Sequence, residues 1–207
     1  MKIYFVRHGE SEANVLHVFS NKDGVHPLTG KGTLQANALA ESLKPVHFYA
    51  IYSSPVLRAV QTSQILSQEL GTPMTITGAL REYDVGILEG RSDEEAWHAH
   101  RELFLKWRDQ NSWNEKIEGG ESYSEMRLRF VPFVEQLIAR HAGEDVNVLA
   151  VSHGGLYLCM LPLIFDNISF DFGLSHPLNN TAVVIGAFSE SKRECLRWGD
   201  QVPGPVR

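Results

Sequence analysis

Two apolar runs, far apart in the sequence, each end in a histidine followed by glycine. The first is I-Y-F-V-R-H-G-E, from Ile3 to Glu10, and the second is V-L-A-V-S-H-G-G, from Val148 to Gly155. In open α/β sheets, ligands bind beyond the carboxyl ends of the strands. If both runs are strands of one sheet, His8 and His153 converge on a single crevice.

Arginines near these motifs indicate the kind of ligand. Arg7 directly precedes His8, and its guanidinium group repels a metal cation, whereas its planar fork of donors suits phosphate oxygens. Arg58 follows an apolar run that ends at Ser53, near the start of a predicted helix whose N-terminus favours an anion. The residues predict an anion site, although Arg58 taken alone is more typical of a solvated helix surface.

The stretch from Leu80 to Gly90, L-R-E-Y-D-V-G-I-L-E-G, is predicted to be a loop with three carboxylates that could donate a proton: Glu82, Asp84 and Glu89. Periodicity does not choose among them, and each is equally typical of an exposed loop acid. Two asparagines could orient a phosphate or cap local turns, and these are Asn14 and Asn180.

Strands and helices alternate along the chain and would position these residues. Runs of β-branched and aromatic residues predict strands at Lys2 to Val6, Tyr49 to Ser53, Asn147 to Ser152, Thr181 to Ala187 and Glu194 to Trp198. Apolar periodicity and capping signals predict helices over Thr33 to Leu43, from a Ser54-Pro55 cap through Leu70 to a stop at Gly71, and over Tyr123 to His141.

This alternation predicts an α/β fold, a three-layer αβα sandwich with a mainly parallel sheet and an antiparallel edge strand. We expect one domain over residues 1–207. The segment from Arg91 to Gly120 is predicted to be a small helical cap insertion because its mixed charges and aromatic residues interrupt the pattern. Its aromatic side chains could stack on a leaving group, but a packed core for the cap is favoured. The apolar stretch from Leu156 to Phe165 is either a core helix or a subunit contact.

Composition bounds the partners and the compartment. The formal net charge of −6 argues against a dedicated nucleic-acid binder, which would carry a basic face. The two cysteines, Cys159 and Cys195, have neither zinc-site nor disulfide spacing, so a reducing compartment is expected. The first apolar run is too short for a signal peptide and the longest is too short to span a bilayer, so we expect a cytoplasmic protein without a membrane partner. Oligomeric state stays open, with a homodimer as one alternative.

Six motifs follow one another along the chain: R-H-G-E-S-E-A-N at 7–14, L-T-G-K-G-T-L-Q-A at 28–36, Y-S-S-P-V-L-R-A-V-Q-T at 52–62, L-R-E at 80–82, G-G-E-S at 119–122 and V-S-H-G-G at 151–155. In this order they resemble the histidine phosphatase superfamily, in the branch that includes cofactor-dependent phosphoglycerate mutases and related phosphatases. The resemblance spans nearly the whole chain.

The resemblance implies a role for each residue. His8 would be the nucleophile that forms a phosphohistidine, and Glu82 would be the proton donor. Arg7, Arg58 and His153 would form the phosphate pocket, with additional phosphate contacts from Asn14, Gly154 and Asn180. No metal or cofactor is implied, because fixed cationic donors stabilise the charge of a transferring phosphoryl group. These roles require His8 to be unprotonated at its reacting nitrogen and Glu82 to hold a proton.

Three alternatives to a phosphomonoester hydrolase are open to the chain. A phosphomonoester hydrolase acting on a small phosphorylated metabolite is favoured over a cofactor-dependent phosphoglycerate mutase, because residues 82–86 read E-Y-D-V-G where the mutases carry E-R-H-Y-G. The F-x-G-W element of the mutases is also absent between Asn14 and Thr29. A non-catalytic phosphate-binding module is disfavoured, since every expected catalytic residue is present. A zinc hydrolase is disfavoured because the chain lacks H-E-x-x-H spacing.

Overall fold

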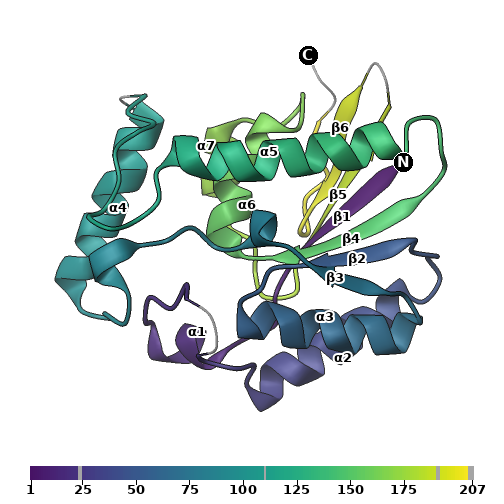
Figure 1. Ribbon diagram of the computed structural model, residues 1–207, viewed down its shortest axis with the longest axis horizontal. Coiled ribbons are helices and arrows are strands. Elements are labelled where there is room, and N and C mark those ends of the chain that lie inside the picture. Colours follow the sequence, from purple (N-terminus) through teal and green to yellow (C-terminus); the bar gives the residue numbers. More distant parts are fainter. Residues whose placement is uncertain (23–24, 110, 190–191, 205–207) are drawn as a thin grey trace.

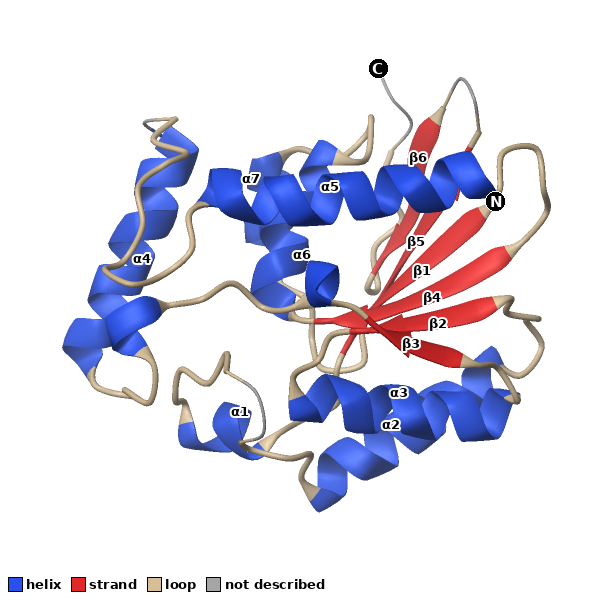
Figure 2. Ribbon diagram, viewed as in Figure 1, coloured by secondary structure: helices blue, strands red, loops and turns tan. Residues whose placement is uncertain are grey.

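A six-stranded sheet lies between two layers of helices in the computed structural model, which describes residues 1–22, 25–109, 111–189 and 192–204 (Figure 1, Figure 2). The strands lie in the order β3-β2-β4-β1-β5-β6. Their bounds are β1 Lys2–Arg7, β2 Ala50–Ser53, β3 Met74–Ile76, β4 Asn147–Ser152, β5 Val183–Phe188 and β6 Arg193–Trp198. β1 to β4 are parallel, whereas β5 runs antiparallel to both β1 and β6, which confirms the predicted mainly parallel sheet with an antiparallel edge.

The helices cover both faces of this sheet (Figure 2). Their bounds are α1 Glu12–Leu16, α2 Gly30–Leu43, α3 Leu57–Leu70, α4 Glu94–Asp109, α5 Tyr123–Arg140, α6 Gly154–Met160 and α7 Phe170–Ser175, with short 3₁₀ turns at Gly78–Leu80, Gly86–Leu88 and Leu161–Leu163. α2 and α3 lie on one face, and α5 and α6 lie on the other (Figure 1).

Strand β1 shows how the sequence builds the two cores. Tyr4 and Val6 are buried in the core that α2 and α3 cover, whereas Ile3 and Phe5 are buried in the core that α5 and α6 cover. Successive side chains of a strand point to opposite faces, so a continuous apolar run is typical of a strand with helices on both sides. β1 therefore lies inside the sheet and holds Arg7 at a fixed position.

Helix α5 follows its predicted pattern. Ser122 caps its N-terminus and forms a capping box with Glu125, which satisfies backbone donors at both positions. Its buried residues, Met126, Phe130, Val134 and Leu137, recur every three or four positions. The helix ends at Arg140, one residue before the predicted end.

The predicted start of the second helix is wrong. α3 begins at Leu57, with Val56 at the N-cap, so Pro55 lies outside the helix. Ser54 is still attached to the sheet, because its backbone N–H donates to Val151 O at 2.9 Å. Its hydroxyl oxygen accepts from the Val56 N–H and contacts His153, which delays the first helical turn. The predicted end at Gly71 is confirmed, since Gly71 is the left-handed C-cap residue.

Two short helices escaped prediction, namely α1 and α7, because periodicity is weak over five or six residues. The interpretation of Leu156 to Phe165 as core holds, since the segment forms α6 and a 3₁₀ turn whose side chains are largely buried within the chain. The predicted cap contains α4, which stands beside the main body (Figure 1); Gln110 lies outside the described residues. None of the helices in the described ranges is long and apolar enough to cross a membrane.

Candidate active site

The register of two parallel strands brings the two histidine motifs together. Arg7 at the end of β1 lies opposite Ser152 at the end of β4, so His8 and His153 follow the two strands in step. The His8 backbone N–H donates to Ser152 O at 3.0 Å, and the two imidazole rings lie 5.1 Å apart between centroids. Both histidines are buried. The convergence expected from strand ends therefore occurs.

The surroundings of His8 assign its tautomer. Nδ1 lies 2.7 Å from Gly9 O, and a carbonyl oxygen only accepts, so Nδ1 carries the proton. Nε2 then has a lone pair and accepts from Arg58 Nε at 2.9 Å. Burial first, and then the charges of Arg58 and Arg7, hold the pKa of His8 well below its ordinary value. His8 is a neutral imidazole with an available nitrogen at neutral pH.

Arg58 is buried at the centre of the site, so the interpretation as a solvated surface residue is wrong. Besides Nε on His8, its Nη1 donates to Ser20 O at 2.7 Å and its Nη2 lies 3.3 Å from His153 Nδ1. Burial lowers the pKa of Arg58 to about 10, with the charge of Glu82 opposing the shift, so the guanidinium stays charged at neutral pH. A fixed cation thus lies beside the reactive nitrogen.

His153 lies behind this arginine. Its Nδ1 faces a guanidinium, which only donates, so Nδ1 accepts and the proton is on Nε2, 2.7 Å from Ser54 Oγ. Burial and then the charge of Arg58 hold the pKa of His153 well below its ordinary value. The neutral ring links the end of β2 to the end of β4 and fixes the orientation of Arg58.

Arg7 carries a donor that the protein leaves open. Its Nη1 donates to Leu178 O at 2.5 Å, while its Nε is buried with no hydrogen-bond partner among the described residues. An unpaired buried donor costs about 1–3 kcal/mol, and an anionic ligand would relieve that cost. Gly154 lies beside this atom, since a Cβ there would come within 3.3 Å of Arg7 Nε.

Glu82 is held by the N-terminus of α6. Its oxygens accept from the backbone N–H groups of Gly155 at 3.0 Å and Leu156 at 2.6 Å. Burial raises the pKa of Glu82, although Arg58 and these backbone donors oppose the shift. Gly155 permits the contact, because a Cβ there would lie 3.0 Å and 3.1 Å from the carboxylate oxygens and 2.7 Å from Tyr83 Cε1.

The other two carboxylates of this loop have structural partners. Asp84 accepts from the backbone N–H of Gly86 at 2.8 Å, and Glu89 accepts from the backbone of Asn21 at 3.0 Å. Neither lines the cavity that contains His8. The geometry therefore separates Glu82 from two acids that sequence periodicity could not distinguish.

The two asparagines support the site in different ways. Asn14 lines the cavity, and its Oδ1 accepts from the backbone N–H of Ser11 and from Asn180 Nδ2, which leaves its amide nitrogen as the donor for an anion. Asn180 does not line this cavity. Its Nδ2 also donates to His8 O at 3.1 Å, so Asn180 holds the backbone of His8 instead of facing the predicted phosphate.

The cavity has a volume of about 230 Å³. It contains Arg7, His8, Asn14, Arg58, Glu82 and Gly154 at one end, whereas His153 lies behind Arg58 and does not line it. Its remaining wall comes partly from α4 and includes Tyr83, Trp97, His100 and Phe104. Sequence reasoning gave Ser20 no role, because a carbonyl anchor has no distinctive pattern, and it assigned Ser54 to a helix cap instead of the site.

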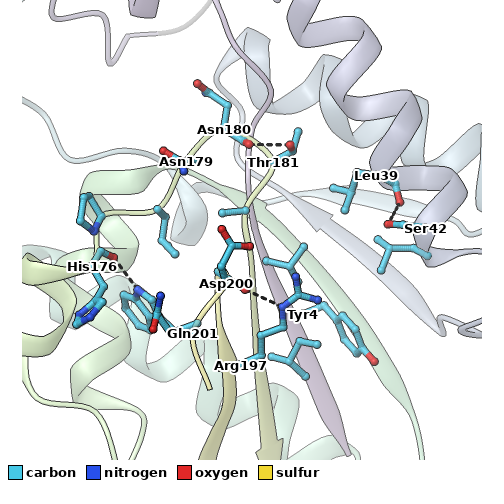
Figure 3. A pocket seen from close by; sticks show the side chains of 18 of the residues that line it. Tyr4, Leu39, Ser42, His176, Asn179, Asn180, Thr181, Arg197, Asp200 and Gln201 are labelled. Atoms are coloured by element: carbon cyan, nitrogen blue, oxygen red, sulfur yellow. Dashed lines mark hydrogen bonds between the residues drawn. The ribbon is translucent and has the colours of Figure 1, made fainter. Parts of the chain in front are cut away.

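A larger cavity of about 680 Å³ lies elsewhere, between α2, β5, β6 and residues 176–182 (Figure 3). Asn180 and Thr181 are on its wall, as are Arg197 and Asp200 (Figure 3). Its lining contains neither His8 nor His153, and none of Arg7, Arg58 and Glu82. Size therefore does not identify the candidate active site, whereas the clustering of charged donors around His8 does.

Comparison with known proteins identifies the family of the chain. The profile of the histidine phosphatase superfamily (branch 1) matches residues 3–201. A protein provisionally named phosphoserine phosphatase 2, from Hydrogenobacter thermophilus, is 34% identical over 154 residues, which are 74% of this chain and 73% of that protein. A 2,3-bisphosphoglycerate-dependent phosphoglycerate mutase of Cytophaga hutchinsonii is 31% identical, over 73% of this chain and 71% of its own.

Solved structures share the fold. A mycobacterial glucosyl-3-phosphoglycerate phosphatase superposes with a TM-score of 0.82 at 23% identity, covering 97% of this chain and 99% of that chain. YhfR of Bacillus stearothermophilus gives a TM-score of 0.81 at 27% identity, covering 97% of each chain. The fold, the motifs and the site together are those of an enzyme that transfers phosphoryl groups through a histidine. The chain belongs to branch 1 of the histidine phosphatase superfamily.

Proposed function

We propose that this chain is a metal-independent phosphomonoesterase that acts on a small phosphorylated metabolite through a phosphohistidine at His8. The observation that carries the proposal is the state of His8, a buried neutral imidazole whose Nε2 lies 2.9 Å from the guanidinium of Arg58. A phosphoryl group bound there would meet a nucleophile and a fixed cation at the same point. Arg7 Nε, buried and unpaired among the described residues, would supply a second donor.

In the first step, His8 Nε2 attacks phosphorus while the bond from phosphorus to the ester oxygen breaks. The imidazole becomes cationic, and the contact from Nδ1–H to Gly9 O stabilises that charge. Glu82 gives its proton to the departing alcohol oxygen, and burial, which raises its pKa, favours the protonated form that this step needs. Arg7 and Arg58 stabilise the charge on the other phosphoryl oxygens.

In the second step, water attacks the phosphohistidine. Glu82, now a carboxylate, takes a proton from the water while the bond between phosphorus and Nε2 breaks. The products are inorganic phosphate and a neutral His8, and the proton donor is restored. His153 and Ser54 are positioning residues in this account, since they hold Arg58 and contact no reacting atom.

A phosphoglycerate mutase is the second candidate function, because a relative of that name is 31% identical over 73% of the chain. A mutase must return the phosphoryl group to a bound phosphoglycerate, so it needs cations for a carboxylate as well as for the phosphate. Arg7 and Arg58 are the only Lys or Arg side chains among the described residues that line the cavity. This lining supports hydrolysis over mutase activity.

A substrate panel with a matched mutase assay tests the proposal. Purified protein is incubated in chelator with phosphomonoesters, and separately with 3-phosphoglycerate in the presence and absence of 2,3-bisphosphoglycerate. We expect phosphate release from at least one ester, undiminished by chelator, and no isomerisation that exceeds hydrolysis. Faster isomerisation would favour the mutase. An absence of turnover with intact phosphate binding would indicate the non-catalytic module.

The proposed setting is the cytoplasm. Cys159 and Cys195 are both buried free thiols, a state that a reducing compartment preserves. Small phosphorylated metabolites are the substrate class that fits a cavity of about 230 Å³. Fractionation of cells expressing the full chain would test the cytoplasmic assignment. Recovery in a membrane or secreted fraction would contradict it.

A further inference from the structure

The candidate active-site cavity has a second end that the phosphoryl chemistry does not use. Beside the arginines, His8 and Glu82, much of its lining is formed by aromatic and aliphatic side chains: Val18, Phe19, Tyr83, Trp97, His100, Phe104 and Leu158. Three of the aromatic residues come from α4, and Phe19 comes from the loop after α1. The alcohol part of a phosphomonoester would extend toward this wall when its phosphoryl group lies at His8.

The aromatic wall is a continuous cluster. Phe19 packs on Trp97 with ring centroids 4.1 Å apart, and His100 lies 4.9 Å from Phe19 and 5.1 Å from Phe104. Trp97 Nε1 donates to His17 O at 3.1 Å, which ties α4 to the main body. These contacts hold the rings in place, so the wall offers preformed aromatic surface to a ligand.

The aromatic wall is also uncharged. His100 is its only titratable base, and burial lowers the pKa of His100 to about 4, with the charge of Arg101 acting in the same direction. Tyr83 hydrogen-bonds to His100 Nε2, and burial raises the pKa of Tyr83 well above its ordinary value. A carboxylate placed against this wall would lose water, and no side chain of the wall would offer it a cation, which is costly.

The volume limits the ligand further. The whole cavity of about 230 Å³ is below the range of roughly 300–1,000 Å³ that drug-sized ligands occupy. Because the phosphoryl group takes part of that space, the remainder suits one ring or a short chain. A second phosphate or a second sugar would have to extend out of the cavity.

We propose that the aromatic wall is the leaving-group subsite and that it selects monoesters whose alcohol is small, uncharged and presents an aromatic or similarly apolar face. This inference rests on the proposed phosphatase activity and narrows its substrate class. It disfavours phosphoglycerates and phosphoserine, because each brings a carboxylate into the cavity as part of its alcohol. Substrate specificity then depends on the uncharged aromatic wall as much as on the charged arginines that bind the phosphoryl group.

Two esters that differ by one remote charge test the inference on the unmodified chain. Benzyl phosphate and 4-carboxybenzyl phosphate have the same type of leaving alcohol, but only the second would place a carboxylate against the aromatic wall. We expect kcat/KM for 4-carboxybenzyl phosphate to be roughly 100-fold lower, the loss typical of an unpaired buried charge. We expect ethyl phosphate, which lacks the ring, to be about tenfold slower than benzyl phosphate.

Variants test whether side chains of α4 select esters that carry a ring. Trp97→Ala should lower kcat/KM for benzyl phosphate about tenfold while leaving that for ethyl phosphate within about twofold. Trp97→Phe should restore most of the loss. Trp113→Ala is the matched control, because Trp113 packs on Tyr123 with centroids 4.6 Å apart and does not line the cavity. An equal loss for both esters in Trp97→Ala would indicate a structural role and contradict the inference.

A gain of function gives an independent check. Phe104→Arg adds a cation to the aromatic wall, so the ratio of 4-carboxybenzyl to benzyl turnover should rise at least about tenfold. Trp97→Arg serves the same purpose if the first variant does not fold, as judged by its melting curve. Unchanged inhibition by inorganic phosphate would show that the phosphate end is intact.

The outcomes separate the two proposals. Hydrolysis of esters with equal or better use of carboxylate-bearing substrates would overturn the leaving-group inference and leave the phosphatase activity standing. No hydrolysis of any ester in the panel would overturn the proposed function itself.

Discussion

The two ends of the candidate active-site cavity are built by different means. At the phosphate end, side chains from the ends of β1 and β4 and from α3 are fixed by hydrogen bonds, as Arg58 shows with three separate contacts. At the other end, Phe19, Trp97 and Phe104 are held mainly by ring packing between α4 and the main body. Hydrogen bonds fix the direction of individual donors and acceptors, whereas packing fixes a shape.

The two ends therefore have different tasks: the phosphate end carries out the chemistry, and the aromatic wall selects the substrate. The phosphate end can bind any phosphoryl group, because its donors address oxygens that all phosphomonoesters share. The aromatic wall meets only the variable part of the substrate. Substitutions at the phosphate end should therefore affect every substrate, and substitutions in the wall should affect substrates selectively.

The largest effect short of removing the nucleophile is expected from Arg58→Lys. A lysine keeps the charge, but it cannot contact His8, Ser20 O and His153 from one planar group. Turnover should fall on the order of 10³-fold for all esters, within the range measured for loss of one preorganised donor. A loss confined to esters that contain a ring would contradict the assignment of Arg58 to the end of the cavity that binds every phosphoryl group. Steady-state kinetics with benzyl and ethyl phosphate measures this.

Glu82→Gln should produce a loss that depends on the leaving group. An alkyl alcohol needs a proton to depart, so its release should slow roughly 10²- to 10³-fold, whereas nitrophenolate departs without help. Burst kinetics with benzyl phosphate and nitrophenyl phosphate compare the two. An equal loss for both esters would remove Glu82 from the role of proton donor.

The dependence of kcat/KM on pH tests the protonation states of Glu82 and His8. Burial raises the pKa of Glu82, so the protonated donor persists further toward neutrality and is lost as pH rises. Burial and two arginines lower the pKa of His8, so the neutral nucleophile persists as pH falls. We expect kcat/KM for benzyl phosphate to be higher at about pH 5.5 than at about pH 8. A profile that rises toward alkaline pH would contradict both assignments.

The smallest effects are expected at the two glycines that follow His153. A Cβ at Gly155 would lie 2.7 Å from Tyr83 and 3.0 Å from a Glu82 oxygen, so Gly155→Ala should displace the proton donor and slow alkyl esters about tenfold. Gly154→Ala is the matched control, because its Cβ would approach Arg7 Nε at 3.3 Å instead. It should raise KM for every ester about threefold. The reverse pattern would reject the placement of Glu82.

The phosphate end could largely be located from the sequence. His8 and His153 follow continuous apolar runs, and parallel pairing of those runs places both rings at one edge. Glu82 could not be separated from Asp84 and Glu89 by pattern alone, because all three lie in one glycine-containing loop. The choice came from resemblance, and the contacts of Glu82 with the N-terminus of α6 now give it a physical basis.

The aromatic wall could not be predicted. The preference for a packed cap core is right for Trp107, which is fully buried, but Trp97 and Phe104 face the cavity. Which rings turn inward depends on how α4 docks against Phe19, a contact between residues far apart in the sequence. The prediction of where α3 starts was wrong for a similar reason, since Ser54 contacts His153 instead of capping the helix.

Detection of the phosphoenzyme tests most directly whether His8 is the nucleophile. Protein mixed with ³²P-labelled benzyl phosphate is quenched within milliseconds in alkaline denaturant, which preserves a phosphoramidate, and the labelled peptide is identified. We expect acid-labile label on His8 and none in His8→Ala, whose turnover should fall on the order of 10⁶-fold, as for other covalent nucleophiles. Label on another residue, or turnover retained in His8→Ala, would contradict a phosphohistidine at His8.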